Sequence, residues 1–456
     1  MKKNILAIMT FIALFTTNLQ AQVAENSKPV VDSGDTSWVI VATALVLFMS
    51  IPGLALFYGG LVRRKNVLSV FMQIFILVAV ISVEWVIIGY SNAFGSNSIP
   101  FLKPFIGGFD WAFLNNISIS ELSPYFISHS QSGISGTQTG TIPHVVFILF
   151  QGMFAVITPA LIIGAFAERI DFKGFVVFSV LWSVLIYNPI AHWVWSADGW
   201  LYALGALDFA GGIVVHISAG IAAIVTALML GKRRDYKGHA LPPHNITYVA
   251  IGTAMLWVGW FGFNGGSGLA ADGLAGNALM VTHISASVAA ITWAGLEWVI
   301  DKRPTVVGIC TGAIAGLATI TGASGFVGIP GAIFIGIASS LLCFVMVAYV
   351  KPKLGYDDSL DAFGVHGVGG ILGVILTGVF ASPFIQSNYS GAIYGNFHQL
   401  WIQLLAVGVT ILFSGGGTFI IFKLTDIFVG VRAEDKDEAI GLDETQHGET
   451  AYTNFD

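Results

Sequence analysis

The chain has 456 residues, of which 55% are hydrophobic and only 10% are charged, and its mean hydropathy is +0.79. Soluble domains carry about 25% charged residues, so this composition predicts an integral membrane protein. The formal net charge of −6 comes without a basic patch, which argues against nucleic acid as a partner, and two cysteines, Cys310 and Cys343, are too few for a disulfide scaffold.

The N-terminus has the pattern of an export signal. Lys2 and Lys3 precede the apolar stretch 5–15, which is shorter than the about 20 residues needed to cross a hydrocarbon core. We therefore expect a signal peptide over 1–21, cleaved after Ala21, and an external segment over 22–37. An uncleaved anchor is the alternative interpretation.

Eleven apolar segments follow, each near the length of a membrane-spanning helix. They lie at 38–60, 67–90, 143–167, 175–195, 210–230, 245–263, 277–300, 304–321, 327–350, 362–381 and 399–422. Together they indicate a membrane domain over 38–430. A long external loop is expected over 91–142, and a cytoplasmic tail over 431–456.

The basic residues predict the orientation of these spans, because short cytoplasmic loops are enriched in lysine and arginine. If the mature N-terminus is external, sixteen of the twenty fall on the inner side: Arg63, Arg64, Lys65, Arg169, Lys173, Lys232, Arg233, Arg234, Lys237, Lys302, Arg303, Lys351, Lys353, Lys423, Arg432 and Lys436. The asymmetry predicts eleven spans with the N-terminus outside and the C-terminus inside.

Two segments five spans apart share a pattern. The fifth contains DFAGGIVVHISAG with Asp208 and His216, and the tenth contains DAFGVHGVGGILG with Asp361 and His366. Because five is odd, the second copy must be inverted, which is the plan of transporters whose sites lie between two repeats near the bilayer midplane. We therefore predict an all-α membrane protein with a five-plus-five inverted repeat and a final helix.

The two histidines are candidate functional residues. A single histidine on an apolar helix is usually a core residue, whereas two in symmetric positions at membrane depth favour a role in a pore or site. The small residues around them would let their helices approach closely. A histidine pair on facing helices is also able to ligate haem, so a membrane cytochrome is a second hypothesis.

Seven stretches occur in a characteristic order: GLALFYGGLVRRKN, LFQGMFAVITPALIIGAFAERI, PIAHWVW, LDFAGGIVVHISAG, GWFGFNGGSG, DAFGVHGVGG and GLDETQHGETAY. In this order they resemble the ammonium transporter family (Amt/MEP/Rh), on its bacterial Amt side. The resemblance implies a homotrimer in the inner (plasma) membrane, with a narrow pore for ammonia or ammonium in each subunit. It implies neither an enzymatic activity nor a cofactor.

The resemblance also implies roles for individual residues. Phe154, Trp195 and Ser267 match an outer site that recruits ammonium, where aromatic faces attract a cation and the hydroxyl accepts an N–H. Phe154 and Phe263 match two rings that close the pore below this site.

Further along the implied pore, His216 and His366 match a hydrogen-bonded pair. Phe150 and Gln151 match pore-lining positions near the outer entrance, although Gln151 is equally suited to a hydrogen bond between helices. Asp208 matches an acid near the recruitment site, but its position before an apolar helix favours an N-cap role, with attraction for a cation as a second effect.

Two polar residues at membrane depth match no role in the family, and we expect Glu84 and His283 to be buried structural partners. The tail motif implies packing beneath the pores and contact with a PII signal protein of the GlnK type. A sensor of ammonium with little flux is a third hypothesis, which a flux assay separates from transport.

Overall fold

The computed structural model describes residues 30–125, 140–236 and 241–452. The expected signal peptide over 1–21 lies outside the described residues. Within the described part every regular element is a helix, and eleven helical stretches are long and apolar enough to cross a membrane. The predicted fold class and number of spans are confirmed.

The first five spans form one half of the bundle. They comprise α2 (Ser33–Phe48), Met49–Gly53 and α3 (Leu54–Leu61); α4 (Val67–Glu84), Trp85–Gly89 and α5 (Tyr90–Phe94); α6 (His144–Phe166); α7 (Phe172–Trp182), Ser183–Tyr187, α8 (Asn188–Trp195) and α9 (Trp200–Ala203); and Gly212–Ile217 with α10 (Ser218–Leu230).

The next six spans complete the bundle. They comprise α11 (Ile246–Trp260) with Phe261–Gly265; α12 (Gly273–Asp301); α13 (Val306–Ile320) with Thr321–Ala323; α14 (Ile329–Val345), Met346–Val350 and α15 (Lys351–Leu354); Phe363–Gly367 with α16 (Val368–Phe380); and α17 (Phe397–Phe428). The tail adds α18 (Asp435–Ile440) and α19 (Leu442–His447).

Several spans contain a single π-helical turn, and three pairs of these turns lie five spans apart. They are Met49–Gly53 with Phe261–Gly265, Ser183–Tyr187 with Met346–Val350, and Gly212–Ile217 with Phe363–Gly367. Equivalent distortions in equivalent spans agree with the predicted five-plus-five repeat. Turns of this kind occur frequently at functional sites.

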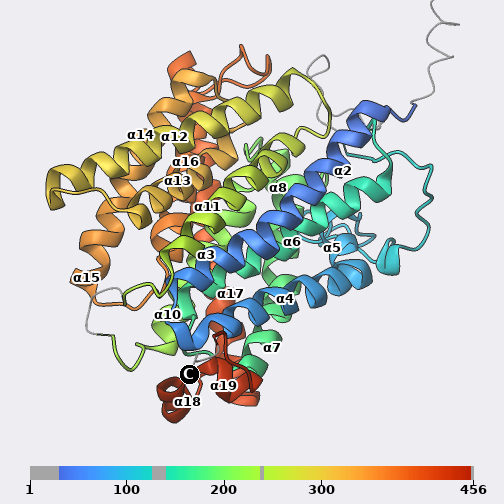
Figure 1. The fold of residues 1–456 in the computed structure, drawn as a ribbon. Coiled ribbons are helices and arrows are strands. Elements are labelled where there is room, and N and C mark those ends of the chain that lie inside the picture. The colour runs from blue at the N-terminus through green and yellow to red at the C-terminus, as the bar shows by residue number, and fades with distance from the viewer. Residues whose placement is uncertain (1–29, 126–139, 237–240, 453–456) are drawn as a thin grey trace, which may run out of the picture.

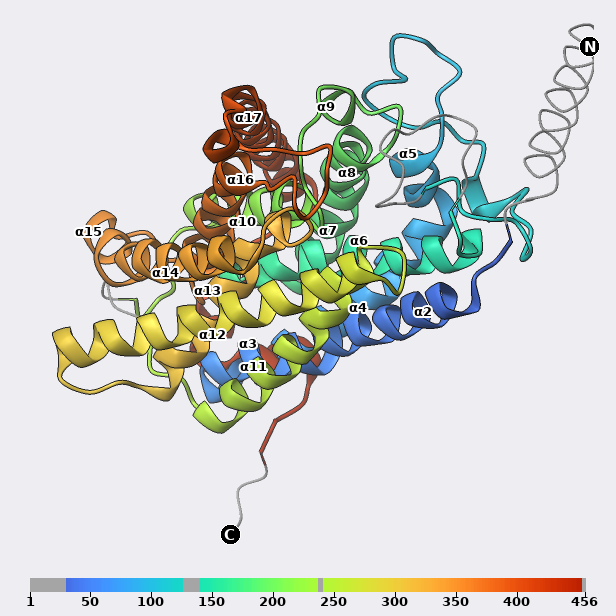
Figure 2. The ribbon, with the colours of Figure 1, turned by 90° about the horizontal axis from the view of Figure 1, so that it is seen from above.

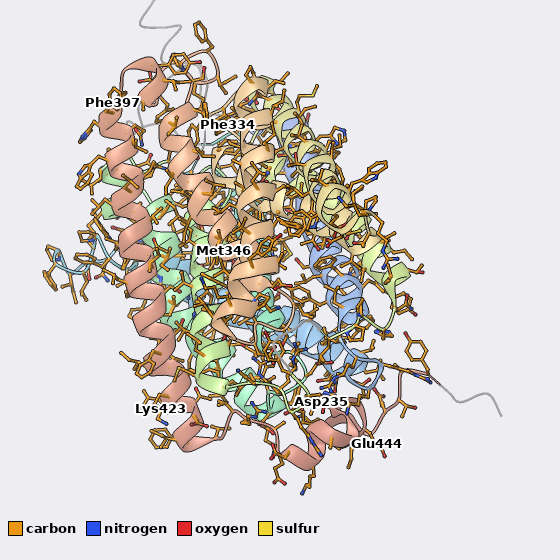
Figure 3. All side chains as sticks on the ribbon, turned by 90° about the vertical axis from the view of Figure 1, so that its left-hand side faces the viewer. Asp235, Phe334, Met346, Phe397, Lys423 and Glu444 are labelled. Carbon is orange, nitrogen blue, oxygen red and sulfur yellow. The ribbon has the colours of Figure 1, made fainter. Side chains whose placement is uncertain are left out.

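The helices form one bundle around α6, which is buried over most of its length and packs against α2, α4 and α10. Figure 1 shows α2 starting at the end of the bundle opposite to α18 and α19. In Figure 3, Phe397 lies at one end of α17, and Lys423, Asp235 and Glu444 lie toward the other. We call this second end the basic face, because Arg63, Arg169 and Arg233 lie there in one network of ion pairs with Asp235, Glu168 and Asp357.

Buried ion pairs hold the connections of the basic face together. Arg233 donates to Glu168 at 2.7 Å and to Asp357 at 2.8 Å, and all three side chains are almost fully buried. Burial alone would raise the pKa of Glu168, but Arg233 and Arg63 outweigh it and hold that pKa below its usual value. Removing one member of such a cluster would leave a buried unpaired charge, which is strongly destabilising.

The tail docks on this face by reciprocal capping. Lys65 donates its ammonium to the carbonyl oxygens of Glu438 (2.9 Å) and Ala439 (2.6 Å), at the end of α18. In return, Asp443 accepts the Ser69 amide at 2.7 Å in the first turn of α4, whose own N-cap residue Asn66 provides no side-chain cap. The tail thus supplies the cap that this membrane span lacks.

Candidate functional site

Both histidines lie in π-helical turns at the start of their spans, His216 in Gly212–Ile217 and His366 in Phe363–Gly367. Each turn is capped by an acid eight residues before its histidine. Asp208 accepts four backbone amides, those of residues 211 to 214, at 2.6–3.0 Å. Asp358 accepts the amides of residues 362 and 363 at 3.1 and 2.8 Å.

The acid equivalent to Asp208 is therefore Asp358, and the pairing of Asp208 with Asp361 suggested by the sequence is wrong. Asp361 accepts Lys351 at 2.7 Å instead. Burial raises the pKa of Asp358 to about 7, with Lys351 opposing the rise and Asp361 adding to it. Burial likewise raises the pKa of Asp208, against the effect of its four amide donors.

Glycines bring the two histidine helices into backbone contact. A Cβ atom on Gly220 would lie 2.1 Å from the Cα of Gly367, and one on Gly370 would lie 2.8 Å from the Cβ of His216. Only glycine fits at such distances, so the close approach expected from the small residues is confirmed.

The imidazole rings of His216 and His366 are nearly parallel, at 11°, with their centroids 5.3 Å apart. Both ring nitrogens of His216 and Nδ1 of His366 are buried without a hydrogen-bond partner among the described residues. The expected hydrogen bond between the two rings is therefore not formed in this structure. Unpartnered buried nitrogens are costly, and they are available to a molecule that carries N–H groups or lone pairs.

The two histidines line a narrow cavity. All other lining side chains are apolar or aromatic: Met49, Leu54, Phe57, Ile157, Leu161, Val215, Leu256, Trp260, Phe263 and Ile314. The imidazoles are thus the polar groups of an otherwise apolar chamber.

A row of rings leads from this chamber toward the start of α2. Phe263 lies 6.2 Å from His216 and 4.3 Å from Phe154, and Phe154 lies 5.6 Å from Trp195 in an edge-on arrangement, all between centroids. The structure therefore places Trp195, Phe154, Phe263 and His216 in sequence, each ring next to the following one.

The remaining predicted site residues surround this row. Ser267 donates its hydroxyl to the Phe263 carbonyl at 2.8 Å, which leaves the hydroxyl lone pairs free to accept an N–H. Trp195 donates its indole N–H to the Asp208 carbonyl at 2.9 Å. Phe150 is buried and lies 5.1 Å from Phe154, whereas Gln151 has a buried side-chain oxygen without a partner among the described residues.

The two residues without a matching role behave differently from each other. Glu84 is buried and accepts Asn188 at 2.9 Å and Ser183 at 3.2 Å, as expected for a structural partner. His283 is exposed on α12, where its ring lies 5.6 Å from that of Trp257. The expectation of a buried His283 is wrong for the single subunit.

Sequence reasoning overlooked Trp260. Its ring lies 5.7 Å from His216 at an angle of 20°, and its indole N–H donates to the Thr321 hydroxyl at 2.9 Å. Thr321 thus holds Trp260 in the wall of the chamber. The signal was present in GWFGFN, where Trp260 precedes Phe263 by three positions.

These features define a polytopic helical membrane protein in which an aromatic row leads to a buried histidine pair. The profile of the Ammonium Transporter Family matches residues 37–452. The chain belongs to this family.

Individual relatives agree with the assignment. The protein named Ammonium transporter from Bacillus subtilis is 47% identical over 421 residues, covering 92% of this chain and 98% of the relative. Ammonium transporter Amt1 from Archaeoglobus fulgidus is 41% identical, with 92% and 99% covered.

Solved structures share the fold. The crystal structure of Saccharomyces cerevisiae Mep2 superposes with a TM-score of 0.78 at 35% identity, covering 89% of this chain and 88% of that one. A structure described as Sensor Amt Protein superposes with a TM-score of 0.80 at 29% identity, covering 91% and 98%.

Proposed function

We propose that this chain is an ammonium transporter of the inner (plasma) membrane, with its basic face in the cytoplasm. Ammonium is recruited near Trp195, Phe154 and Ser267, passes Phe263, and crosses the chamber as ammonia or ammonium along His216 and His366. The observation that carries this proposal is the continuous row of rings that ends on unpartnered imidazole nitrogens.

The chemistry of the chamber supports selectivity. An apolar chamber removes hydration from a permeating cation, which costs several kcal/mol unless other groups replace the lost contacts. An imidazole replaces part of them by accepting an N–H or by relaying a proton. Potassium has neither an N–H nor a proton to give, so the same chamber excludes it.

Two alternatives receive less support. A haem would need space between the two imidazoles, but the helices that carry them touch at Gly220 and Gly367. A sensor with little flux would not require a path that leads to the histidine pair, although a relative described as a sensor shares the fold.

The proposal is tested by expressing the chain in cells that lack their own ammonium transporters. We expect growth on scarce ammonium and uptake of labelled ammonium to be restored. Membrane-inserted protein without any uptake would favour the sensor hypothesis.

The recruitment site gives a quantitative prediction. Trp195→Leu keeps apolar bulk but removes the cation–π attraction, so the apparent affinity for ammonium should weaken roughly three- to thirtyfold, for a loss of about 0.7–2 kcal/mol. Concentration-dependent uptake measures this change. Trp401→Leu, at a position 64% exposed on α17, is the matched control and should leave affinity unchanged; equal affinities for both variants would refute the recruitment role of Trp195.

We expect the tail to support transport by means of its contacts with the basic face. Truncation after Val431 removes the contacts of Lys65 and Asp443 and also that of Arg432 with the Lys232 carbonyl, while all eleven spans remain. We expect insertion to persist and uptake at matched membrane abundance to fall at least severalfold.

The control for the truncation is Lys436→Gln, which breaks only an exposed ion pair with Glu434 and should transport normally. A PII protein of the GlnK type, our proposed partner at this face, should be captured by the intact chain and lost on truncation. Unchanged uptake and capture would mean that the tail has no regulatory role.

We also propose a homotrimer. An exposed histidine on a membrane-spanning helix is costly in lipid, which supports burial of the His283 face against a neighbouring subunit. The mass of the purified protein in detergent tests this.

A further inference from the structure

The segment between the second and third spans carries exposed, large apolar side chains far in sequence from the pore. We call Ile99, Phe101, Phe105, Phe109 and Phe113 the aromatic collar. Their exposed fractions are 54, 79, 41, 72 and 65%. Figure 2 shows this part of the chain, which follows α5, standing out from the bundle near α5, α8 and α9.

The collar is fixed to the fourth span at one side. Trp193 donates its indole N–H to the Phe105 carbonyl at 2.8 Å, and the Trp200 amide donates to the Pro104 carbonyl at 3.2 Å. A ring nitrogen of His192 lies 2.8 Å from the Lys103 carbonyl. The exposed rings are therefore held on a backbone attached to the outer ends of α8 and α9.

The other side of the collar is fixed to the second span. The ring of Trp111 stacks on that of Tyr90 at 5.4 Å, and the Trp111 amide donates to the Ser91 hydroxyl at 3.0 Å. The turn Ala112–Leu114 packs on the π-helical turn Trp85–Gly89. Tyr90 and Ser91 lie in the last turns of the second span, and Trp193 lies near the end of α8, so the collar is attached close to the ends of these helices.

Exposed apolar side chains of the second span lie next to the collar. On that span Val83, Val86 and Ile87 are 58, 42 and 39% exposed, and they lie in or beside the turn against which Ala112–Leu114 packs. Exposed apolar side chains that extend from the collar onto a membrane-spanning helix support lipid as the partner.

The charges of the segment 96–120 decide whether electrostatic attraction or apolar burial would drive its binding to a membrane. Residues 96–120 contain a single base, Lys103, and a single acid, Asp110. Lys103 is already paired with Asp198 at 3.1 Å. Attraction to anionic headgroups is therefore weak, and only apolar insertion remains as a driving force.

We propose that the aromatic collar inserts into the boundary between headgroups and acyl chains of the leaflet at which α2 begins, and that its partner is lipid. Aromatic side chains favour this zone of a bilayer, and an apolar surface that penetrates it binds by its buried area. Inserted in this way, the collar anchors the outer ends of α5 and α8 beside the pore entrance. The inference is independent of the proposed transport activity.

The test uses spin labels on the full chain in phosphatidylcholine vesicles. Phe109→Cys and Phe113→Cys carry the label, and Ser98→Cys and Asn115→Cys, exposed polar positions of the same segment, are matched controls. Cys310 and Cys343 are buried and stay in place. We expect the collar labels to collide with oxygen and to be protected from a water-soluble nickel chelate at least about fivefold more than the controls.

Two outcomes would overturn the proposal. Equal access of the nickel chelate to collar and control labels would place the collar in water, and protection of the collar labels from both reagents would place it against protein. Adding anionic lipid to the vesicles should change neither the oxygen accessibility nor the nickel-chelate accessibility of the collar labels.

A second measurement uses the unmodified chain. A photoactivatable phosphatidylcholine should form adducts within residues 99–113 as well as at Leu412, which is 77% exposed on α17. Adducts on α17 without any on the collar would contradict lipid contact.

Discussion

Replacing His216 with aspartate should let potassium pass. A fixed carboxylate in the chamber substitutes for the hydration of any cation, whereas an imidazole favours a species with an N–H to donate. We expect potassium-driven uptake or current to rise at least about tenfold, which requires only about 1.4 kcal/mol of differential stabilisation. Growth of a potassium-uptake mutant on scarce potassium gives an independent readout.

The control for this variant is Ser414→Asp at a buried position of α17 that donates to the Ser218 carbonyl and does not line the chamber. It introduces the same charge near the same helix but outside the path. If a folded His216→Asp variant still excludes potassium, the histidine pair does not determine the selectivity.

Replacing Asp208 with alanine should destabilise the protein severely. Four buried amides would lose their acceptor, and an unsatisfied buried donor costs about 1–3 kcal/mol, against a typical total stability of about 5–15 kcal/mol. We expect a large fall in the yield of monodisperse protein and in its unfolding temperature.

The Asp208→Asn variant separates structure from charge. Its single carbonyl oxygen still accepts some of these amides, so stability should be intermediate, while the negative charge near the recruitment site is gone. An Asp208→Ala variant as stable as the native chain would contradict the capping role.

Span positions could be predicted well from hydropathy where a span ends near the hydrocarbon boundary. The tenth was expected over 362–381 and spans Phe363–Phe380. The second, expected over 67–90, extends over Arg64–Phe94, because polar contacts hold its ends: the tail contacts one end, and Gly107, Gly108 and Trp111 contact the other.

The acid before the second histidine shows where pattern reasoning failed. Three acids, Asp357, Asp358 and Asp361, occur close together before His366, and similarity of the following residues favoured the last. The spacing of eight residues from Asp208 to His216 would have selected Asp358. Asp357 and Asp361 are engaged by Arg233 and Lys351, which are distant in sequence or on another span.

The histidine pair was predictable because it repeats across the two halves, but its geometry was not. The distance between the rings depends on Gly220, Gly367 and Gly370 meeting across two helices. The π-helical turns that orient the rings produce no recognisable hydrophobic periodicity in the sequence. Trp260 cannot be distinguished there from the other apolar residues.

The central claim is that ammonium crosses this protein along Phe263 and the two histidines. The most direct measurement is the entry of isotope-labelled ammonium into vesicles that contain the purified chain, at acidic pH where leakage of free ammonia through lipid is small, compared with a Leu161→Trp variant whose added bulk fills the chamber. The account predicts entry well above that of protein-free vesicles for the native chain and entry at the protein-free level for a folded Leu161→Trp variant. Equal entry for both proteins, or no entry with the native chain, would contradict it.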